Sequence, residues 1–356
     1  MEALKGRKIV AQGNALDNPQ PKRAKPCRGE TISRSLRYFV SPLQGFITWR
    51  DLFSQGVALG CIVLALSGLT AFAQATSGSA PLPPVDIVKN VRYGTVNGSD
   101  LLLDVYRPKA MPKELMPAVV WIHGGAWQYG DKEKPLAGIL SYYGYFVVSI
   151  DYRLAPTNKF PAALEDAKCA VRWLRANAAQ MRIDPDHIGV WGASAGGHLA
   201  AMVGLTSDRK EFDGKGGQPD QSSRVQAVCS FFPPTQWEPS VDQDPRQREI
   251  CVNFLGGTYA QMPDVYRAAS PVTYASKDAP PFLLVHGDTD SEVPISQSEK
   301  LDAALRQAGA DVTFLRVKNA GHGFQSANGQ PVSPSYQEIQ NTVVRFFNKH
   351  LKKTSP

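Results

Sequence analysis

One serine in the sequence stands in a setting that favours nucleophilic catalysis. Ser194 is the centre of the run Gly-Ala-Ser-Ala-Gly at 192–196, which matches the Gly-x-Ser-x-Gly pattern of a nucleophile elbow. Apolar residues 188–191 precede the run and suit a buried strand, and residues 195–205 follow it with a helical pattern. This context predicts that the Ser194 hydroxyl lies above the edge of a sheet, where it could attack a carbonyl carbon. A glycine-rich helix start with an incidental serine is the alternative interpretation.

The residues around Ser194 fit the same chemistry. A side chain at Gly192 or Gly196 would clash inside so tight a turn. The N–H of Ala195 falls at the N-terminus of the predicted helix, where it can donate a hydrogen bond to a developing oxyanion. We therefore expect Ala195 to supply half of an oxyanion hole.

A second glycine-rich segment follows the apolar run 118–122 and reads His-Gly-Gly-Ala-Trp. Glycines let the backbone approach a substrate and turn its N–H groups toward a carbonyl oxygen, and Gly124 serves that approach. We expect the N–H groups of Gly125 and Ala126 to complete the oxyanion hole, and His123 to hold the loop by hydrogen bonds rather than to transfer protons. The run His-Gly-Gly also occurs in ordinary turns. The interpretation therefore depends on its position in the chain before the Gly-x-Ser-x-Gly run.

An acid and a base should follow the serine in the order Ser, Asp, His. His322 stands between two glycines after the apolar run 312–317, and we expect it to be the base. The remaining histidines after residue 123 are less suited by position: His187, His198, His286 and His350. The acid must accept the Nδ1–H of the base. Asp288, Asp290 and Glu292 share one loop after an apolar strand, and position alone leaves all three open.

The elements that would position these residues alternate along the chain. Short apolar runs typical of buried strands occur at 118–122, 146–150, 188–191, 225–231, 282–285 and 312–317, after a predicted hairpin of 86–93 and 101–106 that turns at Asn97-Gly98. Helical patterns occupy 161–178, 195–205, 295–308 and 335–351. Buried strands separated by helices predict an α/β domain at 86–352, with a mostly parallel sheet covered by helices on both faces.

Two polar insertions interrupt this alternation, at 207–223 and 233–281. The longer one has no clear period, and we expect a small lid over the active site. Its aromatic residues could form the lid's own core or line a substrate pocket: Trp237, Phe254, Tyr259, Tyr266 and Tyr274.

The basic charge of the chain lies in its first segment. Of the net charge of +7, residues 1–75 carry +6, from ten Lys or Arg and four acidic residues. The remainder is close to neutral, so no nucleic-acid partner is implied. A mean hydropathy of −0.25 excludes a polytopic membrane protein.

The apolar residues 57–73, after this basic segment, predict a leader for export to the periplasm or the medium. An uncleaved membrane anchor is the alternative, because 17 residues are near the lower limit for a bilayer span. Membrane contact is expected only in that case. Residues 76–85 read as a Ser/Pro linker.

The cysteines predict neither a disulfide framework nor a metal site. Two of the five lie in the leader, leaving Cys169, Cys229 and Cys251. A Cys229–Cys251 disulfide is possible in an oxidising compartment, and buried free thiols are the favoured expectation. We expect no metal and no cofactor.

Five ordered motifs together resemble a known family. HGGAW, DYRLAP (151–156), GASAGGH, HGDTDSEVP and GHGF are similar to those of bacterial feruloyl and acetyl-xylan esterases, which neighbour the hormone-sensitive-lipase-like carboxylesterases. The resemblance covers about residues 85–350 and implies the α/β-hydrolase fold. It also implies that the second aspartate of HGDTD, Asp290, is the acid, and that Arg153 and Asp166 form a supporting ion pair. Ala126 departs from the family, where many relatives have glycine.

These observations predict a serine ester hydrolase that works through an acyl-enzyme. Small acyl or aryl esters are the expected substrates, including acetyl or feruloyl groups on plant polysaccharide. The alternatives are an amidase, formamidase or exopeptidase with the same triad, and a catalytically silent binding module with this fold.

Overall fold

The computed structural model describes residues 83–133 and 135–353. The predicted leader with its apolar segment, and most of the predicted linker, lie outside the described residues. Within the described part of the chain, no helix is both long enough and apolar enough to cross a bilayer.

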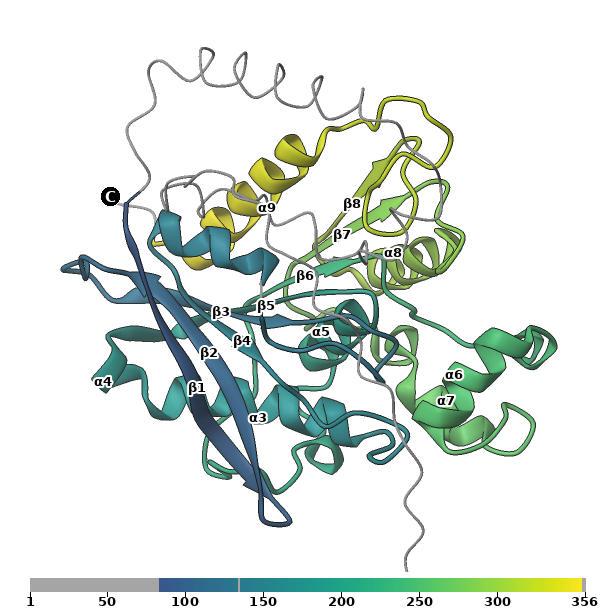
Figure 1. Ribbon diagram of the computed structural model, residues 1–356, viewed down its shortest axis with the longest axis horizontal. Coiled ribbons are helices and arrows are strands. Elements are labelled where there is room, and N and C mark those ends of the chain that lie inside the picture. The colour runs from purple at the N-terminus through teal and green to yellow at the C-terminus, as the bar shows by residue number, and fades with distance from the viewer. Residues whose placement is uncertain (1–82, 134, 354–356) are drawn as a thin grey trace, which may run out of the picture. The chain divides into compact units, whose positions relative to one another are not determined.

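Eight strands form one sheet, in the order β1-β2-β4-β3-β5-β6-β7-β8 (Figure 1). β1 pairs antiparallel with β2, β2 pairs antiparallel with β4, and all other neighbours are parallel. The strands are β1 (Val85–Val96), β2 (Ser99–Pro108), β3 (Met116–Ile122), β4 (Phe146–Ile150), β5 (Ile183–Ala193), β6 (Ala227–Phe231), β7 (Phe282–Gly287) and β8 (Val312–Val317).

Helices cover both faces of the sheet, as the sequence predicted. The α-helices are α3 (Ala162–Ala176), α4 (Ala178–Met181), α5 (Ala195–Leu205), α6 (Pro245–Leu255), α7 (Pro263–Ala269), α8 (Ser296–Ala308) and α9 (Tyr336–Leu351). The short 3-10 helices are η2 (Leu136–Tyr143), η3 (Lys210–Phe212), η4 (Pro239–Gln243) and η5 (Pro271–Tyr274). α3 and α5 pack on one face, and α9 and η2 pack on the other (Figure 1).

Each central strand contributes to two hydrophobic cores because successive side chains point to opposite faces. In β3, Val120 belongs to the core under α3 and α5, whereas Val119 and Trp121 belong to the core under α9. All seven residues of β3 are buried. Such strands show no polar alternation, which is why the apolar runs predicted their positions.

Local sequence signals fix several element ends. Asn97 and Gly98 have φ values of 50° and 80°, the positive pair that a two-residue hairpin turn requires, and the predicted β1–β2 hairpin is confirmed. Ser335 and Glu338 form a capping box at the start of α9.

The longer insertion is more regular than the sequence indicated. Residues 233–281 showed no clear period, yet they contain α6 and α7 with a short 3-10 helix before and after them. Each of these four elements has proline in its first turn, a position where the missing N–H costs nothing. The short helices leave too few turns for a periodic pattern to be seen.

Candidate active site

The residues predicted to do chemistry follow the carboxyl ends of neighbouring strands. β3 leads into the His123 loop, β5 into Ser194, β7 into the loop of Asp290, and β8 into the loop of His322. The sheet order places β3, β5, β6, β7 and β8 side by side. β4 lies on one side of β3 and β5 on the other, so the chain reverses direction here, which is where open α/β sheets bind ligands.

Ser194 has the strained backbone of a nucleophile elbow. It lies between β5 and α5 with φ 57° and ψ −121°, a conformation that is costly for a residue other than glycine. A Cβ atom at Gly192 would lie 2.1 Å from the Gly196 carbonyl oxygen, and one at Gly196 would lie 2.1 Å from the Ile122 oxygen. The turn therefore requires both glycines, as predicted.

The His123 loop packs directly against this elbow. A Cβ atom at Gly124 would lie 3.3 Å from the Ser194 Cβ. Gly125 has φ 112°, and a Cβ there would meet the Tyr129 carbonyl oxygen at 2.2 Å. Ala126 also has a positive φ, 51°. Within residues 83–133 and 135–353, the N–H groups of Gly125 and Ala126 donate to no backbone or side-chain acceptor, so both can serve a ligand.

His123 holds the loop, as expected. Its Nδ1–H donates to the Gly124 carbonyl oxygen at 2.7 Å, and its ring stacks on Tyr152 with centroids 4.2 Å apart. The Tyr152 hydroxyl donates to the His123 carbonyl oxygen at 3.1 Å. Burial lowers the pKa of His123 and favours the neutral ring.

Asp290 and His322 form a hydrogen-bonded pair. His322 Nδ1 donates to Asp290 Oδ2 at 2.8 Å, while Asp290 Oδ1 accepts the N–H groups of Glu292 and Val293 at 2.9 and 3.0 Å. Burial raises the pKa of Asp290, but hydrogen bonds from His286 and His322 outweigh it and hold that pKa well below its usual range. The carboxylate is therefore charged, and it orients the imidazole with Nδ1 protonated and Nε2 free to accept a proton.

The other two acids of this loop have different partners. Asp288 Oδ1 accepts the backbone N–H of Asn319 at 2.7 Å, which ties the acid loop to the base loop. Glu292 pairs with Arg246 at 2.7 Å on the surface. Of the three candidates, only Asp290 contacts His322.

Two consecutive phenylalanines contact the elbow and the base. The Ser194 N–H donates to the Phe231 carbonyl oxygen at 2.9 Å, and the next ring, Phe232, lies 4.4 Å from the His322 ring between centroids. Among the described residues, no hydrogen bond joins the Ser194 hydroxyl to His322. In unliganded enzymes, bonds of this kind often tighten only when substrate binds. Phe232, at the end of an apolar run, carried no sequence signal for this position.

The remaining histidines have structural partners. His286 is fully buried behind the acid, with Nε2 donating to the Val293 carbonyl oxygen at 2.8 Å and lying 3.3 Å from Asp290 Oδ2. His187 pairs with Asp184 at 3.0 Å. His350 lies on α9 against the Phe346 ring.

The ion pair implied by the family resemblance is present. Arg153 and Asp166 meet at 2.8 Å, with Nε and one terminal nitrogen both donating to the carboxylate. Arg153 also contacts Glu165 at 2.8 Å. The pair fixes the segment after β4 to the start of α3.

The described cysteines are free thiols. Cys169, Cys229 and Cys251 are all buried, and the possible Cys229–Cys251 disulfide is absent from the described chain. Burial raises the pKa of Cys251 to about 12, which keeps this thiol protonated and unreactive.

Helix α6 connects the two sides of the candidate site. Near its start, Arg246 pairs with Glu292 of the acid loop. At its end, Phe254 stacks on Trp127 of the His123 loop, with centroids 4.1 Å apart and rings within 5° of parallel. Phe254 thus packs outside the insertion, whereas Tyr266 packs against Trp237 and Tyr259 within it, as expected for a core of the insertion.

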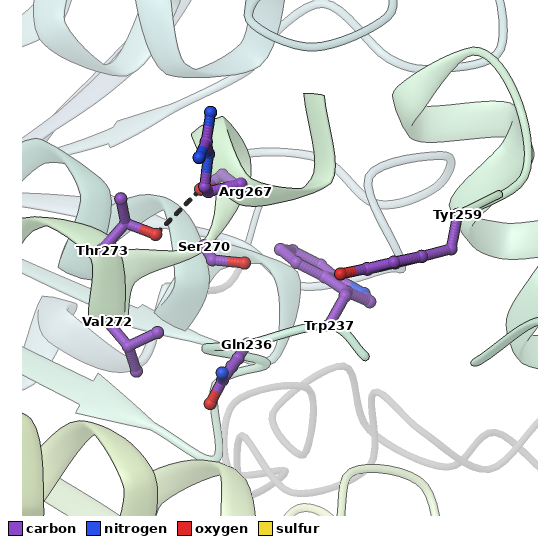
Figure 2. A pocket seen from close by; sticks show the side chains of 7 residues that line it. All are labelled: Gln236, Trp237, Tyr259, Arg267, Ser270, Val272 and Thr273. Atoms are coloured by element: carbon purple, nitrogen blue, oxygen red, sulfur yellow. Dashed lines mark hydrogen bonds between the residues drawn. The ribbon is translucent and has the colours of Figure 1, made fainter. Parts of the chain in front are cut away.

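The insertion also forms a partly open cavity of about 270 Å³ (Figure 2). Trp237 and Tyr259 form aromatic walls, and Arg267 and Thr273 line another side (Figure 2). None of the predicted catalytic residues lines this cavity. Its lining residue Trp237 lies near the His123 loop, with a ring centroid 6.0 Å from that of Trp127.

Comparisons with known proteins find a matching family and related esterases. The family model for BD-FAE matches residues 103–305. Esterase LipC of Mycobacterium tuberculosis is 35% identical over 247 residues, which are 67% of this chain and 60% of LipC. The match therefore spans less than two thirds of that relative.

Solved structures show the same fold. A truncated carbohydrate esterase from gut microbiota has a TM-score of 0.63 at 28% identity, covering 78% of this chain and 100% of its own. Esterase Est2 of Thermogutta terrifontis has a TM-score of 0.61 at 26% identity, covering 76% of this chain and 96% of its own. With the mostly parallel sheet covered on both faces, these similarities confirm the α/β-hydrolase fold.

Proposed function

The chain belongs to the BD-FAE family, and from that membership and the geometry of its site we propose that it is a serine carboxylic-ester hydrolase. The observation that carries the proposal is the Asp290–His322 pair, which lies in the loops after β7 and β8 of the sheet whose strand β5 leads into a serine with elbow geometry. The assignment of Ser194, His322 and Asp290 as nucleophile, base and acid is part of this proposal.

The reaction proceeds through an acyl-enzyme. His322 Nε2 takes the hydroxyl proton of Ser194 as Oγ attacks the ester carbonyl carbon, and Asp290 stabilises the imidazolium that forms. The N–H groups of Gly125, Ala126 and Ala195 hold the oxyanion. The imidazolium then protonates the leaving alcohol, and a water molecule repeats both steps on the acyl group. No step uses a metal or a cofactor.

We place the substrates among small acyl or aryl esters. The family resemblance of the sequence motifs and the likeness to a carbohydrate esterase support acetyl or feruloyl groups on plant polysaccharide. We also propose that the enzyme is exported, on the basic segment and apolar run of residues 1–75. N-terminal sequencing of protein recovered outside the cytoplasm tests export, and an intact leader on that protein would favour the anchor instead.

Hydrolysis rates across a matched substrate set test the activity. We expect p-nitrophenyl acetate, butyrate and methyl ferulate to be cleaved, and p-nitroacetanilide, the amide counterpart of the acetate, to be cleaved far more slowly. Ser194→Ala should lower kcat on the esters by about 10⁴-fold or more without loss of the folded state. An amide rate that exceeds the ester rate would favour an amidase, and no Ser194-dependent turnover would favour a binding module.

A further inference from the structure

His198 is a buried imidazole that the proposed mechanism does not use. It lies on α5, one helical turn after Ser194, and its exposed fraction is 0%. Its Nδ1 accepts a hydrogen bond from the Trp127 indole Nε1–H at 3.2 Å, and its Nε2–H donates to the Ala269 carbonyl oxygen at 2.8 Å. One side chain thus joins the nucleophile helix, the His123 loop and the end of α7.

Both partners require His198 to be neutral with its proton on Nε2. An indole N–H can only donate and a carbonyl oxygen can only accept, so each ring nitrogen has a fixed role. The ring is enclosed by Trp127, Trp237 and Phe254, at centroid distances of 5.1, 5.4 and 5.8 Å. These neighbours carry no charge, and burial lowers the pKa of His198 to about 4.

Trp127 belongs to a strained segment that shapes the proposed oxyanion hole. Ala126 and Trp127 have φ values of 51° and 60°, in the left-handed region that is unfavourable for a residue with a Cβ. Such backbone persists only where surrounding contacts hold it. The stacked Phe254 ring holds the Trp127 side chain by its face, and the bond to His198 is the one polar contact of this indole among the described residues.

We infer that His198 is a positioning residue that locks the oxyanion loop to the nucleophile helix through the Trp127 indole. The inference rests on the proposed function. The proposed hole takes Ala195 from α5 and Gly125 and Ala126 from the loop, so its two halves belong to different elements. The His198–Trp127 bond fixes one half relative to the other.

A residue with this role should act on the transition state more than on substrate binding. The oxyanion exists only after attack, so a loosened hole lowers kcat and leaves KM little changed. A trifluoromethyl ketone, which forms an oxyanion with a nucleophilic serine, should lose affinity by the same factor as kcat. Substitution of a residue with a purely structural role would not change kcat and the affinity for this inhibitor by the same factor.

Three substitutions separate the hydrogen bond from packing. His198→Leu and His198→Asn have nearly equal size, but only Asn offers an oxygen where Nδ1 now accepts. Trp127→Phe removes the indole donor and keeps a ring to stack on Phe254. We expect about a tenfold loss of kcat in His198→Leu and in Trp127→Phe, and substantially less in His198→Asn. The double variant Trp127→Phe/His198→Leu should lose no more than the worse single variant, because both remove the same bond.

A readout that needs no turnover completes the test. The Trp127 indole N–H should exchange with solvent slowly in the wild type and in His198→Asn, and at least about tenfold faster in His198→Leu, as measured by NMR. Additive losses of kcat in the double variant, losses confined to KM, or equal indole exchange rates in the wild type and His198→Leu would overturn the inference. Failure of the proposed function would look different: the wild type would show no Ser194-dependent ester hydrolysis, while the exchange rates would still test the contact.

Discussion

His322 Nδ1 lies 2.8 Å from Asp290 Oδ2, and the other oxygen of the same carboxylate accepts two backbone N–H groups. The two backbone N–H groups thus fix the position of the carboxylate, and the carboxylate in turn orients the imidazole. This arrangement keeps Asp290 charged and sets the tautomer of His322 that a general base needs. The nearby Asp288 accepts the backbone N–H of Asn319 instead and does not contact His322.

The two aspartates of the acid loop should therefore respond very differently to the same change. Asp290→Asn keeps the shape of the side chain but removes the charge and places an amide against His322, so kcat should fall by about 10³–10⁴-fold. Asp288→Asn keeps an oxygen for the Asn319 N–H and should lower kcat by less than about tenfold. Steady-state hydrolysis of p-nitrophenyl acetate compares them, and equal losses would remove Asp290 from the role of acid.

The contact between the elbow and the His123 loop predicts a strong effect from a single methyl group. A Cβ at Gly196 would lie 2.1 Å from the Ile122 oxygen and 2.5 Å from the His123 oxygen, so Gly196→Ala must displace the strand end that carries the oxyanion loop. We expect kcat to fall by about 100-fold or more. Gly138→Ala is the matched control, because its Cβ would meet only ordinary contacts, at 3.6 Å or more. Wild-type turnover in Gly196→Ala would contradict the described packing.

The two ends of α6 should contribute unequally to stability. Phe254 is 1% exposed and stacked on Trp127, so Phe254→Ala should lower the free energy of unfolding by about 3–5 kcal/mol. Arg246 pairs with Glu292 at the surface, where solvent screens the charges, and Arg246→Ala should cost less than about 1 kcal/mol. Urea denaturation measures both, and a larger loss in Arg246→Ala would be inconsistent with this account.

Burial of His198 predicts a dependence of stability on pH. Its pKa falls from 6.5 to about 4 in the folded protein, so between these values the unfolded chain binds a proton that the folded chain does not. The free energy of unfolding should therefore decrease as the pH falls from 7 to 4, by about 3 kcal/mol from this group. His198→Asn removes the titrating group. The free energy of unfolding of the wild type minus that of His198→Asn should therefore decrease by about 3 kcal/mol as the pH falls from 7 to 4. A difference that stays constant over this range would contradict a neutral, buried His198.

Strands and motifs were predictable from the sequence because each has a local cause. The apolar runs at 146–150 and 312–317 coincide with β4 and β8, and the helical pattern at 195–205 coincides with α5. Buried parallel strands need apolar side chains on both faces, and the elbow needs glycine where the backbone closes on itself. These requirements act on neighbours in the chain and therefore leave a pattern that can be read.

Contacts between distant segments left no such pattern. The choice among Asp288, Asp290 and Glu292 depends on how two loops meet, and position along the chain could not decide it. His198 was one more residue of an apolar helix until Trp127 and Ala269 were placed beside it, 71 residues away on either side. The arrangement of 233–281 was hidden for the same reason, since Phe254 of α6 stacks on Trp127 and Tyr266 of α7 packs against Trp237, contacts between residues far apart in the chain.

Covalent labelling of the nucleophile tests the central claim most directly. Diethyl p-nitrophenyl phosphate should react with the wild type to one phosphoryl group per chain, and peptide mass spectrometry should find that group on Ser194. Ser194→Ala should remain unlabelled, and Asp290→Asn should react much more slowly because its His322 no longer activates the hydroxyl. Stoichiometric labelling of Ser194→Ala, or of any other residue in the wild type, would contradict the assignment of Ser194 as the nucleophile.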